Sequence, residues 1–69
     1  MQSEQELIEA VKVEIARCRK LAESYEEIGP VGVFGLGVIH QSIRRAEEAL
    51  RSNNYQQLET ALEDLRARE

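Results

Sequence analysis

The chain has 69 residues, about half the length of a typical domain, of which 42% are hydrophobic and 32% are charged. This apolar content excludes an acidic disordered tail, while the short length limits the core that one copy can bury. With 9 Lys and Arg against 13 Asp and Glu the net charge is −4, which argues against a general nucleic-acid binder, because such proteins neutralise phosphates with a basic surface. We expect one helical domain over residues 1–69 that gains stability from self-association.

Few residues offer reactive chemistry. Cys18 is the single cysteine, so neither an internal disulfide nor a cysteine-based zinc site can form, and one His leaves no metal-ligand spacing. We expect no metal and no cofactor. The longest apolar stretch, 28–39, is interrupted by Gly and Pro and is too short to cross a bilayer, and residues 1–6 lack the features of a signal peptide. The sequence predicts a cytoplasmic protein with no membrane partner.

The first helix is predicted over residues 4–28. Ser3 and Glu6 form a Ser-x-x-Glu capping box at its start, and Gly29-Pro30 ends it. Apolar residues recur at alternating spacings of three and four, which is typical of helices packed side by side. They are Ile8, Val11, Ile15, Cys18, Ala22 and Tyr25, and Leu7, Leu21 and Ile28 widen the stripe. At 1.5 Å per residue this helix is roughly 37 Å long, so we expect part of it to contact another subunit.

The second and third helices are predicted over residues 32–52 and 55–67. The start of the second is the less defined, because Pro30 favours a first helical turn whereas glycine disfavours helix by about 1 kcal/mol per residue. Asn53 tolerates a left-handed conformation and Asn54 can cap the third helix, so the pair predicts the break. The apolar stripes are Leu36, Ile39, Ile43, Ala46 and Leu50 in the second helix, and Tyr55, Leu58, Ala61, Leu62 and Leu65 in the third.

These elements predict an all-α fold, a three-helix hairpin or bundle with a long first helix, that forms a homo-oligomer. Apolar residues between 31 and 39 point around most of the second helix rather than along one stripe, which indicates surplus apolar surface. A dimer is the default because two-fold closure is the commonest symmetry. The expected interface residues are Ile8, Val11, Ile15, Cys18, Val33, Leu36 and Ile39.

The most unusual segment is the glycine-rich stretch 29–37, Gly-Pro-Val-Gly-Val-Phe-Gly-Leu-Gly. Glycines at a helix start can bring backbone N–H groups close to an anion, but a P-loop or dinucleotide-binding fingerprint is not present. Missing side chains also permit close helix packing. Both interpretations stay open, and both hold if a ligand lies between subunits.

Gly29-Pro30-x-Gly32-x-Phe34-Gly35, followed by Ile39, Ala46-Glu47-x-Ala49-Leu50 and a short third helix, resembles small proteins encoded by tailed phages and prophages. The resemblance covers roughly residues 25–65. It implies a phage accessory role in the cytoplasm of the host cell, including antagonism of host defence, and it supplies no catalytic residue.

The best polar constellation lies in the second helix, where His40 and Arg44 share a stripe and Arg45 adjoins it. These side chains can bind an anionic ligand, and Arg is suited to phosphate. The alternative is a solvated face in which Arg44 pairs with Glu48 and Arg51 with Glu47. A solvated face is also expected for the basic residues of the first helix, Lys12, Arg17, Arg19 and Lys20. The candidate contact residues are Gly29, Gly32, Phe34, Gly35, His40, Arg44 and Arg45.

No enzyme signature is found, since Cys18 lies in an apolar seam with no orienting acid and the adjacent carboxylates diverge on a helix. We therefore expect no catalytic residue and a non-enzymatic phage-type accessory protein that binds and antagonises a host protein. Two alternatives are an oligomer that sequesters a small anionic nucleotide and a self-assembling structural factor. The acidic net charge favours a basic protein partner.

Overall fold

A computed structural model describes residues 3–68 of the chain. Within this range it contains helices and no strand: α1 (Glu4–Ile28), the 3-10 turn η1 (Gly29–Gly32), α2 (Val33–Ser52) and α3 (Tyr55–Arg66). The predicted all-α fold of three packed helices with a long first helix is confirmed. The expected ranges differ by one residue at the start of α2 and at the end of α3, because η1 takes Gly32 and the last turn closes early.

Local capping explains where the helices begin. The Ser3 hydroxyl accepts from the backbone N–H of Glu6 at 3.1 Å, and the Glu6 carboxylate accepts from the backbone N–H of Ser3 at 3.4 Å, as in a capping box. Asn53 adopts φ 53°, a left-handed conformation, and the side chain of Asn54 accepts from the backbone N–H of Gln57 at 3.0 Å. The predicted start of α1 and the predicted break before α3 therefore have the expected chemistry.

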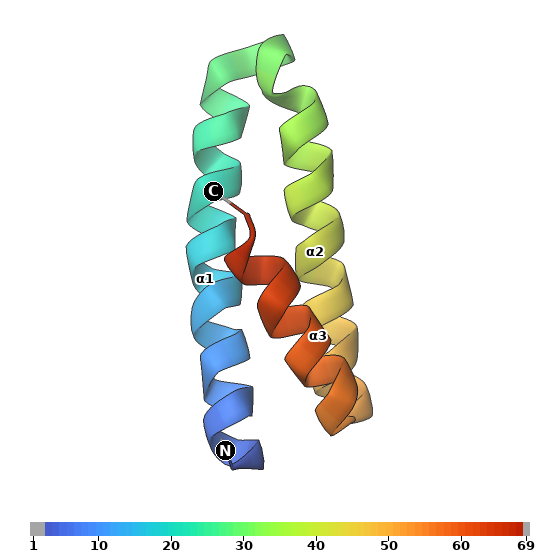
Figure 1. Ribbon diagram of the computed structural model, residues 1–69. Coiled ribbons are helices and arrows are strands. Elements are labelled where there is room, and N and C mark those ends of the chain that lie inside the picture. The colour runs from blue at the N-terminus through green and yellow to red at the C-terminus, as the bar shows by residue number, and fades with distance from the viewer. Residues whose placement is uncertain (1–2, 69) are drawn as a thin grey trace.

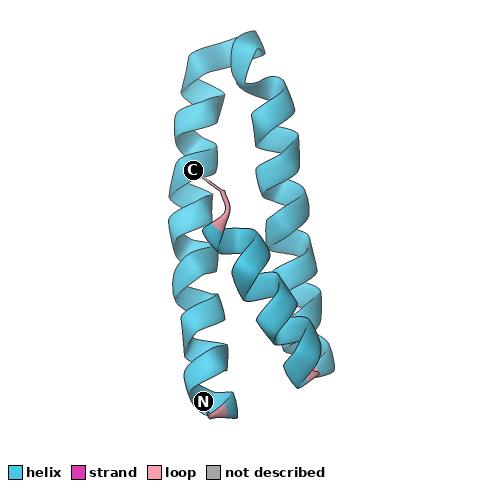
Figure 2. Cartoon of the chain, viewed as in Figure 1, coloured by secondary structure: helices cyan, strands magenta, loops and turns pink. Residues whose placement is uncertain are grey.

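The three helices are unequal in length, and this difference determines the shape of the molecule. α1 and α2 form a long antiparallel hairpin, and α3 folds back diagonally across one face of it (Figure 1). α3 has 12 residues against 25 in α1, so it covers only the half of the hairpin that lies far from η1. Figure 2 shows the same arrangement, with loops confined to the ends of the described chain and the break before α3. The molecule measures 40 × 16 × 16 Å.

The core lies between the three helices and is built from the predicted stripes with small shifts. In α1, Leu7 at the predicted margin of the stripe is fully buried, and Ile8 at its predicted centre is half-buried. In α2, Ala49 is buried and the predicted Leu50 is half-buried. Ser42 is the one buried polar residue in the described chain. The buried apolar residues are Leu7, Val11, Ile15, Cys18, Ala22, Ile39, Ile43, Ala46, Ala49, Leu58, Ala61, Leu62 and Leu65.

The end of α3 is fixed to the middle of α1. The Arg17 guanidinium donates to the backbone carbonyl of Leu65 at 2.7 Å, and the Cys18 thiol lies 3.6 Å from the same oxygen. A cation that binds the last carbonyls of a helix also interacts favourably with its dipole. Arg17 is exposed, as expected for the solvated basic face of α1, and its guanidinium also reaches a backbone carbonyl 48 residues away in the sequence. Burial raises the pKa of the Cys18 thiol.

Candidate interaction surface at the hairpin tip

The hairpin tip, residues 21–40, is the end of the hairpin that α3 leaves uncovered (Figure 1). Gly29 adopts φ 84° and ψ −145°, a conformation open essentially to glycine alone. Pro30 follows at the start of η1, where a missing N–H is tolerated. These two residues turn the chain from α1 into α2.

Two other glycines allow the helices to approach closely beside this turn. A Cβ atom on Gly32 would lie 2.4 Å from the backbone oxygen of Tyr25, and one on Gly35 would lie 2.4 Å from Cε2 of the Tyr25 ring. The Tyr25 ring therefore occupies the space that an incoming ligand would need above Gly35. Gly37, in contrast, has no neighbour within 4 Å of its Cβ position. Close packing thus accounts for Gly32 and Gly35 without a ligand.

The apolar residues between the glycines are exposed. Val31 is 87% exposed, Phe34 85%, Val33 64% and Ile28 57%. We call these four residues the tip surface. The expected surplus of apolar surface is thus found around η1 and the first turn of α2, while Ile39 lies in the core. Nothing in the fold of a single chain requires Phe34 to be aromatic.

A groove opens beside Phe34, on the face of the hairpin that carries α3. It has a volume of about 340 Å³. Tyr25 and Gly35 lie in it, and Ala67 and Arg68, just after α3, close its inner end. We call this the tip groove; its lining residues are Tyr25, Phe34, Gly35, Val38, Ile39, Ala67 and Arg68.

Charge is distributed unevenly along the hairpin. The tip carries Glu23, Glu26 and Glu27, all exposed, and no Lys or Arg. Basic residues gather farther down, where Arg45 of α2 and Arg68 lie near the end of α3. The tip is therefore acidic, and the one basic side chain that lines the tip groove is Arg68, which pairs with Asp64.

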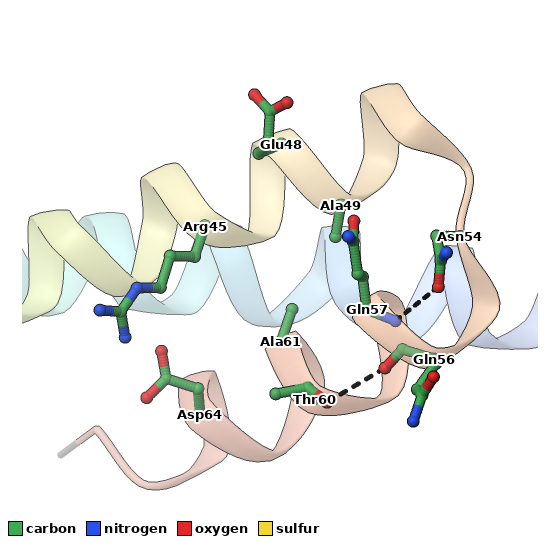
Figure 3. A pocket seen from close by; sticks show the side chains of 9 residues that line it. All are labelled: Arg45, Glu48, Ala49, Asn54, Gln56, Gln57, Thr60, Ala61 and Asp64. Atoms are coloured by element: carbon green, nitrogen blue, oxygen red, sulfur yellow. Dashed lines mark hydrogen bonds between the residues drawn. The ribbon is translucent and has the colours of Figure 1, made fainter.

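The candidate contact residues from the sequence fall into separate places. The glycines and Phe34 lie at the tip, His40 and Arg44 are exposed along α2, and Arg45 points toward α3 (Figure 3). The expected pairs Arg44–Glu48 and Arg51–Glu47 are wrong: Glu48 pairs with Arg51, and Glu47 pairs with Arg19 of α1. Neither Arg44 nor Arg45 forms an ion pair with any residue in the range 3–68.

A second groove, of about 510 Å³, lies between α2 and α3 (Figure 3). Its walls carry side-chain amides and hydroxyls, including Gln56 and Thr60, and Arg45 and Asp64 at one end. Asp64 accepts from Arg68 at 3.0 Å through Oδ1, while its Oδ2 is buried without a hydrogen-bond partner. The short α3 and its diagonal path create this groove, which no sequence pattern indicated.

Most of the expected interface residues lie inside one chain. Val11, Ile15, Cys18 and Ile39 are buried in the core between the three helices, and Ile8 is half-buried against it. The core of a single chain accounts for their apolar character. Among the expected set, Val33 is exposed and Leu36 is half-buried, so the surface available to a partner is concentrated at the tip.

Across residues 3–68, no group of three or more His, Cys, Asp or Glu side chains is arranged to hold a metal ion. None of the helices described is long and apolar enough to span a membrane. Comparison with protein-family models, with curated proteins and with solved structures returns no match. The resemblance to phage proteins accordingly stays a prediction carried by the motif around Gly29 and Phe34.

Proposed function

We propose that the chain is a non-enzymatic accessory binding protein that acts by docking onto another protein through its tip surface. The observation that supports this proposal is the exposure of Phe34 and its apolar neighbours, which the fold of one chain does not use. Single exposed apolar residues are ordinary, whereas a contiguous group marks an interaction site. Complete burial of each such side chain contributes about 1.5–3 kcal/mol, so a partner that covers the tip gains substantial binding energy there.

The phage resemblance provides the biological setting of the proposal. An accessory protein of this kind antagonises a host protein or a defence pathway by occupying a surface that the target needs. Glu23, Glu26 and Glu27 are exposed on the last turns of α1, next to the apolar residues in the chain, so a target that combines an apolar patch with basic groups fits best.

Affinity capture from host lysate tests the proposal, with Phe34→Ser as the disruptive variant. Val13→Ser is the matched control, because Val13 is 63% exposed but lies on α1 outside the tip. We expect a protein that is captured by the wild type and by Val13→Ser and lost by Phe34→Ser, and that binds again when both components are purified. Capture that is insensitive to Phe34→Ser would contradict the proposal.

A second candidate function is the sequestering of a small anionic nucleotide. It is favoured by Arg44 and Arg45, which form no ion pair within the described chain, and by the absence of any acidic residue between positions 28 and 46. Denaturing the purified protein and analysing the released small molecules tests it. A nucleotide that is recovered from the wild type and lost in an Arg44→Glu, Arg45→Glu double variant would favour this candidate over protein docking. A third candidate, in which self-assembly is itself the function, uses the same tip surface.

A further inference from the structure

We infer that two copies of this chain dock with their hairpins antiparallel, so that the tip of each copy lies in the tip groove of the other. The inference rests on the proposed function: in the absence of any other protein, a second copy of the chain covers the tip surface.

The third layer of the fold is incomplete. α3 lies over the hairpin only as far as the level of Cys18, where the Leu65 carbonyl meets Arg17. Beyond this point α1 and α2 continue as two helices with no third element across their face (Figure 1). A hairpin with two helices buries only the sides that face each other, so at the tip both broad faces stay open, including the face on which α3 lies farther down. A helix placed there would continue the layer that α3 begins.

The tip groove offers a place for an apolar side chain of a second copy. Tyr25, Val38 and Ile39 line it, together with Ala67 and Arg68, which follow α3 in the chain. Phe34 stands at its edge and is 85% exposed. In an antiparallel pair, the Phe34 ring of one copy lies over the groove of its partner, and the partner's ring does the same in return. A single two-fold axis relates these two contacts, so both Phe34 rings are covered, as an isologous interface requires.

Charge complementarity favours a second copy over an unrelated protein. The tip carries Glu26 and Glu27 and no Lys or Arg. The groove ends beside Arg68, which pairs with Asp64, and Arg45, which has no ion pair in residues 3–68, lines the neighbouring groove between α2 and α3 together with Asp64. An antiparallel second copy brings its acidic tip toward Arg45, and the symmetry repeats the contact. A parallel pair would instead bring like charges and the two α3 helices together.

The first experiment measures mass by sedimentation and light scattering over a range of concentrations. We expect the wild type and Val13→Ser to form dimers, and we expect Phe34→Ser to raise the dimer dissociation constant at least about tenfold. Circular dichroism should show an unchanged fold, because Phe34 is exposed in the single chain.

The second experiment tests the charge contact with two variants, neither of which should dimerise with itself. Glu26→Arg, Glu27→Arg places like charges against Arg45, and Arg45→Glu places like charges against the acidic tip. Each variant alone should be monomeric at concentrations at which the wild type is dimeric. Mixed together they should form a heterodimer, because both contacts then join opposite charges.

The outcomes separate this inference from the proposed function. A wild type that stays monomeric up to about 1 mM overturns the second copy as occupant, and so does a dimer that survives Phe34→Ser. Mixed charge variants that do not associate overturn the antiparallel arrangement. If the chain is monomeric but captures a host protein in a Phe34-dependent manner, the proposed function stands and the inference falls. If it does neither, both are wrong.

Discussion

The Tyr25 ring lies where the side chain of Gly35 would be, with Cε2 only 2.4 Å from the ideal Cβ position. One half-buried aromatic residue thus explains why the first turns of α2 contain a residue that disfavours helix. The same ring forms part of the tip groove. The local packing of the hairpin and its candidate binding surface therefore share a residue.

This relationship predicts opposite effects at two glycines of α2. Gly37→Ala should stabilise the protein by about 0.5–1 kcal/mol, because its Cβ position is open and alanine favours helix. Gly35→Ala should destabilise it by about 1 kcal/mol, because the Tyr25 ring must shift. Chemical denaturation of both variants measures the difference. Equal stabilisation at the two positions would show that the Tyr25 contact imposes no constraint.

A second prediction concerns the end of α3. Arg17→Met should lower the free energy of unfolding by about 1–2 kcal/mol, because it removes a charged donor from the partly buried carbonyl of Leu65. Arg19→Met is the control, since the Arg19 ion pair with Glu47 is largely exposed and should contribute about 0.5 kcal/mol or less. Equal losses in the two variants would mean that the contact between Arg17 and α3 is not a fixed part of the fold.

The Cys18 thiol gives a prediction on pH. Burial raises its pKa above that of the unfolded chain, so its contribution to stability is fully present below the ordinary thiol pKa and is lost as the pH rises through the folded pKa. Between neutral and strongly alkaline pH, the wild type should therefore lose more unfolding free energy than Cys18→Ala. Urea denaturation of both proteins at the two pH values measures this difference. Identical losses of unfolding free energy in the two proteins would show that the Cys18 thiol is exposed to water in the folded protein.

Thiol labelling offers an independent check of the same site. Cys18 is fully buried and lies beside the Leu65 carbonyl at the end of α3. Labelling of the native protein should be at least about a hundredfold slower than that of the unfolded chain, because α3 must first move away. Arg17→Met should accelerate it. Rapid labelling of the wild type would show that α3 is not docked as described.

The helix boundaries could be predicted because their determinants are local. Ser3 with Glu6, and Asn53 with Asn54, act within a few residues of the backbone groups that they satisfy. The periodic stripes likewise identified most of the core. Where two neighbouring apolar residues competed, as with Leu7 and Ile8, the rotation of α1 against α2 and α3 decided which one is buried.

The candidate site could be predicted only in part, because it depends on contacts between distant residues. The sequence indicated an unusual glycine segment and surplus apolar residues. It did not show that Tyr25 fills the space over Gly35, or that α3 ends beside Cys18 and leaves the tip uncovered. The partners of Glu47 and Glu48 were also missed, because Arg19 approaches from another helix and Arg51 is better placed than Arg44.

The central claim is that the fold of one chain does not use Phe34 and that a second copy of the chain buries its side chain at the tip. Thermal unfolding over a hundredfold range of protein concentration tests it most directly, because association that stabilises only the native state raises the melting temperature with concentration. We expect the melting temperature to rise with concentration for the wild type and for Val13→Ser. Phe34→Ser should melt at one temperature throughout, close to that of the wild type at its lowest concentration. A wild-type melting temperature independent of concentration, or a Phe34→Ser protein that melts lower even at high dilution, would contradict the claim.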